Sequence, residues 1–93
     1  MRVIVLSGQY KKDLKLARRR NLPEAELNDV IFKLANDVPL GPEKRDHSLM
    51  GKYSKLRECH IQPDWLLIYS KEDRDLRILN LYRTGSHSDI FKQ

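Results

Sequence analysis

The sequence predicts an α+β fold in two layers, with two helices packed on one side of a largely antiparallel sheet. Three observations support this class: a β-branched apolar run near the start, two segments with apolar residues at helical spacing, and three apolar runs joined by short polar connections. The chain has 93 residues, the length of one small domain. We therefore expect a single domain over residues 1–93.

Composition indicates a folded protein with a preference for acidic partners. Hydrophobic residues make up 40% and charged residues 33%, which is typical of globular domains. Lys and Arg number 18 against 13 Asp and Glu, a net charge of +5 that favours RNA, DNA or an acidic protein as a partner. Cys59 is the single cysteine, which excludes an internal disulfide and agrees with a cytoplasmic location. No apolar run reaches the roughly 18 residues of a membrane span.

The first half of the chain predicts one strand and two helices. Residues 2–7 are apolar without alternation, so we expect a strand that is buried on both faces. Residues 9–20 carry apolar side chains on one side of a helix and lysines and arginines on the other. Asn21, Pro23 and Glu24 resemble a capped entry to a second helix that runs to about residue 37. Its apolar spacing is regular, with Leu27, Val30, Ile31, Leu34, Ala35 and Val38.

The second half predicts a loop, a meander of three strands and a short helix. Residues 39–52 contain two prolines and two glycines, and we expect a long loop that forms a wall of the functional site. Strands are expected over residues 53–61, 65–70 and 76–83, and their short connections imply antiparallel pairing. The run of residues 66–69 lacks polar alternation, so the middle strand is expected to be covered on both faces or to line a cleft.

Three histidines are the candidate proton carriers, because an ordinary imidazole titrates near ~6.5 and can act as acid or base. His60 closes one predicted strand and Asp64 opens the next, so a tight turn would bring them to one edge of the sheet. His87 follows Ser86, which is suited to cap a short helix whose free N–H groups favour a phosphate. His47 lies in the predicted loop.

Neighbouring residues fit an RNA substrate. Arg57 and Arg83 offer planar guanidinium groups suited to phosphate, while Trp65 and Phe91 offer faces for an unstacked base. These are the parts for RNA cleavage without a metal or another cofactor, in which a base takes the 2′-hydroxyl proton and an acid protonates the departing 5′-oxygen. A non-catalytic module that binds RNA or an acidic protein is the alternative.

Each residue also has a structural explanation. A lone histidine is usually solvated or packed, Asp64 after Pro63 suits a turn, and Trp65 in an apolar strand suits the core. A metal site built from the three histidines and Asp64 is chemically allowed. However, the sequence lacks a close histidine or cysteine pair, so we expect no metal.

Three segments of the chain resemble the YafQ branch of the RelE/ParE superfamily, the toxins of bacterial type II toxin–antitoxin pairs. The first is residues 46–49 followed by Gly51, the second is residues 57–69, and the third is residues 83–87 with Phe91. The order of the predicted elements also matches the RelE-like fold, in which a strand and two helices precede a three-stranded antiparallel meander and a short terminal helix.

The resemblance implies an mRNA endonuclease, usually acting in the ribosomal A site, that a dimeric antitoxin wraps and blocks. It points to a cleavage site of His47, His60, Asp64, His87 and Phe91, with Trp65 and Arg83 adjoining. We expect His87 to be the general acid, Asp64 or His47 the base, and His60 to position the phosphate. Gyrase-poisoning ParE-like relatives lack this set of histidines, which weakens that alternative.

Overall fold

The computed structural model describes residues 1–53 and 55–91. Its regular elements, in chain order, are β1 (Val3–Leu6), α1 (Gly8–Arg19), α2 (Glu24–Ala35), the 3-10 turn η1 (Pro42–Lys44), β2 (His47–Ser48), the 3-10 turn η2 (Gly51–Tyr53), β3 (Arg57–Gln62), β4 (Trp65–Asp73), β5 (Arg77–Gly85) and α3 (His87–Phe91). No helix in these ranges is long and apolar enough to cross a membrane.

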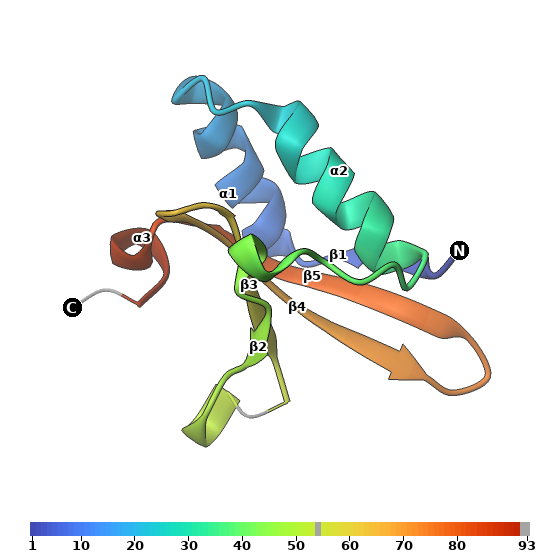
Figure 1. Cartoon of the computed structure of the whole chain (residues 1–93). Coiled ribbons are helices and arrows are strands. Elements are labelled where there is room, and N and C mark those ends of the chain that lie inside the picture. The colour runs from blue at the N-terminus through green and yellow to red at the C-terminus, as the bar shows by residue number, and fades with distance from the viewer. Residues whose placement is uncertain (54, 92–93) are drawn as a thin grey trace.

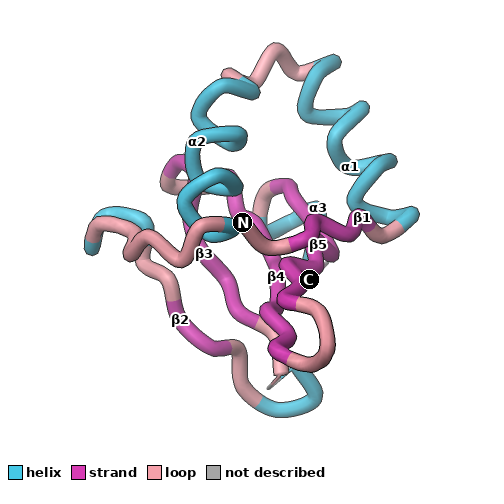
Figure 2. The backbone as a smooth tube through the Cα atoms, turned by 90° about the vertical axis from the view of Figure 1, so that its right-hand side faces the viewer, coloured by secondary structure: helices cyan, strands magenta, loops and turns pink. Residues whose placement is uncertain are grey.

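The strands form one sheet in the order β1-β5-β4-β3-β2, which is covered on one side by α1 and α2 (Figure 1). β3, β4 and β5 form an antiparallel meander, and β1 pairs with β5 in parallel. Figure 2 shows both helices above the sheet, with α1 toward the β1 edge. The predicted two-layer α+β fold, including the meander and the short terminal helix, is confirmed.

The core lies between the helices and the facing side of the sheet. Tyr10 and Ala17 of α1 pack there, as predicted from their spacing, and α2 contributes Leu27, Val30 and Leu34. The sheet contributes Cys59, Ile61, Trp65, Leu67, Tyr69, Leu79 and Leu81. Burial of this apolar surface fixes the sheet beneath the helices and leaves its other face for the site.

The strand predicted over residues 2–7 is present as β1, but the prediction that it is buried on both faces is wrong. β1 is an edge strand, and Val3, Ile4, Val5 and Leu6 are 37–49% exposed. An apolar run without alternation is typical of a central parallel strand. Here β1 pairs in parallel with β5 at the edge of the sheet, and its side chains remain partly exposed on both faces.

The connections also differ from expectation in detail. Asn21 does not cap α2, because it has a left-handed backbone (φ 57°) and Pro23 occupies the cap position without a side-chain hydrogen bond. The predicted loop of residues 39–52 contains η1 and β2 and the start of η2. The first meander strand was expected from residue 53 but begins at Arg57, and residue 54 lies outside the described residues.

A β-bulge in β5 changes which side chains face away from the helices. Ile68 pairs with Arg83 and Tyr69 pairs with Leu81, so Tyr82 has no partner on β4. Such an extra residue shifts the alternation of the side chains that follow it. Leu66, Leu67 and Ile68 are all buried, which agrees with the expectation that the middle strand is covered on both faces or lines a cleft.

Candidate active site

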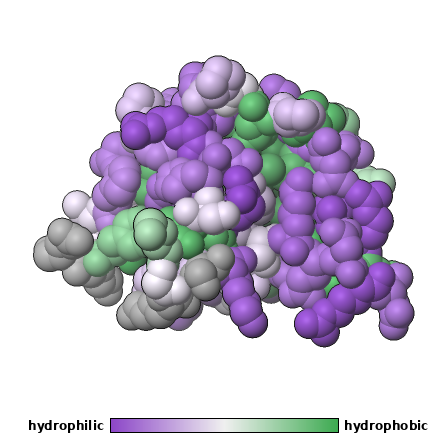
Figure 3. Space-filling view, turned by 60° about the horizontal axis from the view of Figure 1, so that its bottom comes forward, coloured by the Kyte–Doolittle hydropathy of each residue, from purple (hydrophilic) through white to green (hydrophobic). Residues whose placement is uncertain are grey.

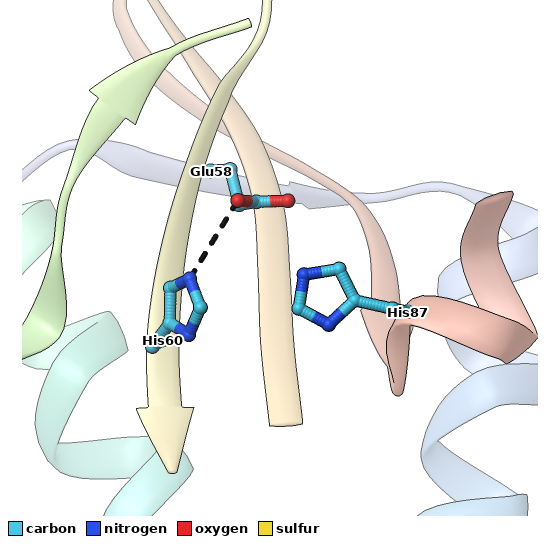
Figure 4. A group of neighbouring side chains, drawn as sticks. All are labelled: Glu58, His60 and His87. Atoms are coloured by element: carbon cyan, nitrogen blue, oxygen red, sulfur yellow. Dashed lines mark ion pairs between the residues drawn. The ribbon is translucent and has the colours of Figure 1, made fainter. Parts of the chain in front are cut away.

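The predicted histidines gather on the face of the sheet that the two long helices leave uncovered. His60 and Glu58 are two residues apart on β3 and therefore share a face. β2 pairs with β3 so that His47 lies opposite Glu58. His87 begins α3, and Figure 4 shows its ring directed toward Glu58 and His60.

Asp64 fixes the position of His87. Its Oδ1 accepts hydrogen bonds from the backbone N–H of His87 (3.1 Å) and from the His87 Nδ1–H (2.8 Å). These two bonds hold the pKa of the Asp64 carboxyl below its usual range. Asp64 therefore bonds to His87, whereas its place in the sequence predicts a position near His60.

The other two histidines are oriented by backbone carbonyls. The Nδ1 of His60 lies 3.1 Å from the Pro63 carbonyl oxygen, and the Nδ1 of His47 lies 2.6 Å from that of Arg45. A carbonyl oxygen only accepts, so both Nδ1 atoms carry the proton and donate. All three imidazoles consequently leave Nε2 for other partners.

Glu58 is a site residue that sequence reasoning missed. Its buried carboxylate places Oε2 3.3 Å from the His47 Nε2 and 3.7 Å from the His60 Nε2. A carboxylate in a strand is usually read as part of a solvated face. The available signal was its i, i+2 spacing from His60, which puts both residues on one side of the strand.

The rings of His60 and His87 lie 5.9 Å apart between centroids. The ring of Phe91, one helical turn after His87, lies 6.2 Å from the His87 ring. His60 is buried, whereas the side chain of His87 is 54% exposed. The pair therefore combines one fixed imidazole with one that is open to an incoming molecule.

Arg83 links α1 to α3, the helix that carries His87. Its guanidinium donates to both carboxylate oxygens of the buried Asp13, at 2.7 Å and 3.3 Å. It also reaches the backbone carbonyl of Asp89 in α3 at 3.4 Å. Asp13, another residue that the sequence did not single out, thus positions Arg83.

Trp65 and Arg57 point to the helix-covered side of the sheet instead. Trp65 is 2% exposed and its indole Nε1–H donates to the Thr84 hydroxyl at 2.9 Å. Arg57 donates to Ser48 and Asp46 and lies 3.3 Å from the Tyr69 hydroxyl. The structure brings neither residue to the histidine cluster, and both have structural contacts that account for them.

The cluster has the donors for a metal ion. One potential ligand atom from each of Glu58, His60 and His87 lies within 4.8 Å of the other two (Figure 4). Two imidazole nitrogens and a carboxylate oxygen suit zinc, copper or nickel. His47 and Asp64, which the sequence also offers as possible ligands, are not part of this set.

Comparisons with known proteins agree with this architecture. Residues 2–92 match the family model described as the bacterial toxin of the type II toxin–antitoxin system, YafQ. The mRNA interferase toxin YafQ of Escherichia coli K12 is 40% identical over 91 residues, which cover 97% of this chain and 96% of that protein.

Two solved structures extend the comparison. A crystal structure of a copper-bound mutant toxin from Helicobacter pylori is 38% identical, has a TM-score of 0.91 and covers 98% of this chain and 100% of that chain. The E. coli DinJ–YafQ toxin–antitoxin complex contains a chain that is 40% identical, with a TM-score of 0.87 and 97% of each chain covered. This chain therefore belongs to the YafQ family of bacterial type II toxin–antitoxin toxins.

Proposed function

We propose that this protein is an endoribonuclease toxin that cleaves mRNA in the bacterial cytoplasm, through attack of the 2′-hydroxyl on the adjacent phosphate. One observation carries the proposal: His60 and His87 come from different elements, and their rings stand 5.9 Å apart with Asp64 bonded to His87. Two oriented imidazoles at this separation suit the two sides of one phosphodiester. The E. coli relative is named an mRNA interferase.

His87 is the general acid in this proposal. Because its Nδ1–H donates to Asp64, its Nε2 remains for the substrate and can deliver a proton to the departing 5′-oxygen. Asp64 keeps the ring in one tautomer and orientation, as the carboxylate of a catalytic triad does. A positioning role suits Asp64 better than the role of base, because its Oδ1 already accepts two bonds from His87.

His60 is the preferred base, which differs from the phosphate-positioning role expected from sequence. The Pro63 carbonyl holds its Nδ1–H, so Nε2 can take the 2′-hydroxyl proton. The Glu58 Oε2 lies 3.7 Å from this Nε2, so its negative charge faces the positive charge that develops on His60 as the ring takes the proton. The proton that leaves the 2′-oxygen passes to His60, the proton on His87 passes to the 5′-oxygen, and the product ends in a 2′,3′-cyclic phosphate.

Two partners follow from this function. The E. coli relative crystallises with DinJ in a toxin–antitoxin complex, and we expect a cognate antitoxin to bind and block the present chain. The net charge of +5 also suits mRNA on the ribosome, with cleavage in the A site. Arg83, which donates to the backbone of α3, and Phe91, whose ring lies beside that of His87, are the residues that we expect to contact the RNA.

A transition metal would compete with this reaction. The H. pylori relative is described as copper-bound, and Glu58, His60 and His87 are arranged to hold such an ion here. An imidazole nitrogen that ligates a metal has no lone pair with which to take a proton. We therefore expect copper to inhibit cleavage rather than support it.

The function is tested by replacing the proposed acid. His87→Ala should lower RNA cleavage by about 10²- to 10⁴-fold, the usual contribution of general acid–base catalysis, and should abolish growth inhibition. The measurement is cleavage of RNA, both free and in translating ribosomes, with thermal unfolding and antitoxin binding as checks of the fold. Ser88→Ala, at an exposed neighbouring position on α3, is the matched control.

A substrate change separates the enzyme from a binding module. A single 2′-deoxy nucleotide at the cleavage position removes the attacking hydroxyl, so it should block cleavage and leave binding intact. Undiminished toxicity of His87→Ala would favour a non-catalytic module, and inhibition of gyrase supercoiling by the purified protein would favour a ParE-like activity.

A further inference from the structure

A hollow lies beside His87 on the face of the sheet that points away from α1 and α2. It has a free volume of about 190 Å³, and its walls include Leu49, Leu56, Ile68, Tyr82, Ile90 and Phe91. Figure 3, in which the underside of Figure 1 comes forward, shows hydrophobic residues at the surface among hydrophilic ones. The reaction proposed above gives no role to most of these walls.

The β-bulge in β5 builds the floor of the hollow. Leu67 and Tyr69 face the helices, so Ile68 between them faces the hollow, where it is 3% exposed. Because Tyr82 is the bulged residue, both Tyr82 and Arg83 reach this side of the sheet. α3 supplies one wall and the segment around η2 supplies the opposite one.

The hollow adjoins the proposed cleavage site at Phe91. Phe91 lines it and also lies 6.2 Å from the His87 ring, measured between centroids. Arg83, which donates to the backbone of α3, is the one charged residue among the lining residues that the structure describes, and none of those residues is acidic. A molecule bound at His87 can therefore extend a group into the hollow, and a neutral or negatively charged group suits this lining.

The volume of the hollow and the side chains that line it suit one kind of ligand. A volume of about 190 Å³ is smaller than the roughly 300–1,000 Å³ of ordinary small-molecule sites, so it admits one flat ring system. Aromatic side chains such as Tyr82 and Phe91 offer faces on which an unstacked base can rest. The aliphatic walls add contacts that depend on the shape of the base.

We propose that this hollow receives one unstacked base of the RNA, next to the cleaved phosphodiester, and thereby determines which sequences are cut. The proposal rests on the endoribonuclease function argued above. The sugar–phosphate chain connects the two sites, so a phosphate at His60 and His87 brings the neighbouring base to Phe91. Selection occurs because a base that fills the hollow holds the phosphate in place for reaction.

The test pairs a change in the substrate with a change in the hollow. Short RNAs with one mapped cleavage site are made with an abasic ribose at each flanking position in turn, free or in the ribosomal A site, whichever the wild type cleaves. Two variants fill the hollow from opposite walls, Ile90→Trp and Leu56→Trp. Phe32→Trp, at an exposed position on α2, is the matched control.

At one flanking position, the abasic ribose should lower kcat/KM of the wild type and of Phe32→Trp by about 5- to 150-fold, the usual effect of one stacked base. Each filled variant should cut the normal RNA with a lower kcat/KM than the wild type. The abasic ribose should not lower the kcat/KM of these variants any further. Its cleavage sites on a long mRNA should also be redistributed. Two variants from different segments, with thermal unfolding of each, separate this result from misfolding.

Other outcomes overturn the proposal. If no abasic position matters to the wild type, or if the loss persists in both filled variants, the hollow does not hold a base. If the variants keep the wild-type cleavage pattern but lose antitoxin binding, the hollow is a protein-docking site. A wild type that cuts no RNA in either form would instead refute the endoribonuclease function itself.

Discussion

Glu58 places a negative charge between two imidazoles on the buried side of the site. Its Oε2 lies 3.3 Å from the His47 Nε2 and 3.7 Å from the His60 Nε2. The carboxylate is buried, so little water competes for its charge. Its negative charge therefore faces the Nε2 atoms of both His47 and His60, where it stabilises the positive charge that an imidazole gains on taking a proton.

Replacing this charge should slow the reaction. Glu58→Gln keeps the shape and removes the negative charge that faces His60, so kcat should fall by about 10- to 100-fold, less than the roughly 10²- to 10⁴-fold contribution of a general acid or base, with a smaller change in KM. Steady-state cleavage of one RNA measures both constants. Glu43→Gln, at an exposed position, should change neither.

Inhibition by copper provides a second measurement on Glu58→Gln. Because Glu58 is one of three potential ligands, Glu58→Gln should need more copper than the wild type for half inhibition. Equal inhibition of both proteins would show that Glu58 does not contribute a ligand.

Sequence spacing identified the three histidines but not their partners. Asp64 was singled out next to His60 in the chain, yet it bonds to His87, which lies 23 residues away. Glu58 and Asp13 were missed because the role of a carboxylate depends on which cation or imidazole the fold brings to it. Trp65 and Arg57 were assigned to RNA, but the face of a strand on which a side chain lies follows from register.

α3 is the element that carries both His87 and Phe91, and it is only five residues long. A helix this short is not stable on its own, so contacts with the rest of the chain must hold it. Ser86 and Asp89 bond to each other's backbone N–H at its start. Arg20, at the end of α1, donates to both carboxylate oxygens of Asp89, at 2.6 Å and 3.1 Å.

Breaking the ion pair between Arg20 and Asp89 should reduce activity more than stability. Arg20→Gln removes a partly exposed ion pair, which typically contributes about 0.2–1 kcal/mol to folding, but it frees α3 and misplaces His87. We expect kcat to fall several-fold with a small change in Tm, and Arg20→Lys should recover part of the activity. Cleavage kinetics and thermal unfolding provide the two measurements.

Helix α1 also offers a matched control for Arg20→Gln. Arg18 makes a similar two-bond pair with Glu24, at 2.9 Å for each bond, and that pair does not involve α3. Arg18→Gln should therefore leave kcat unchanged. Equal losses of kcat in Arg20→Gln and Arg18→Gln would mean that the ion pair between Arg20 and Asp89 has no special role in catalysis.

Elements with strong internal periodicity were predictable, and elements defined by their neighbours were not. α1 and α2 follow from apolar spacing, and the meander follows from short connections between apolar runs. β2 has two residues, too few to show a pattern, although it brings His47 to Glu58. The exposure of β1 depends on its place at the edge of the sheet, which its own residues do not reveal.

Across the whole molecule, the cluster around Asp37 ties the two layers together at the end away from α3. Asp37 follows α2, and its carboxylate accepts from Arg2, which precedes β1, and from Lys71 of β4, both at 2.8 Å. It also accepts from Arg77 at the start of β5. One carboxylate therefore connects the helical layer to three strands.

This cluster should make stability depend on acidity. Hydrogen bonds from Lys71 and Arg2 hold the pKa of Asp37 well below its usual range, and Arg20 does the same for Asp89. In the unfolded chain both groups regain the ordinary aspartate pKa of about 3.9. Between the lowered and the ordinary values the unfolded state binds more protons than the folded state, so stability is fully present above the ordinary value and falls as pH falls.

We therefore expect Tm to be level near neutral pH and to decline as the solution is acidified from about pH 5 downward. Asp37→Asn should have a lower Tm at pH 7, because its amide cannot satisfy the cations of the cluster, and a shallower decline toward pH 3. Circular dichroism melts over this range measure both quantities. Asp29→Asn, which removes a pair with Lys33 within α2, should keep the wild-type slope, and a wild-type slope in Asp37→Asn would remove this cluster as a source of the acid sensitivity.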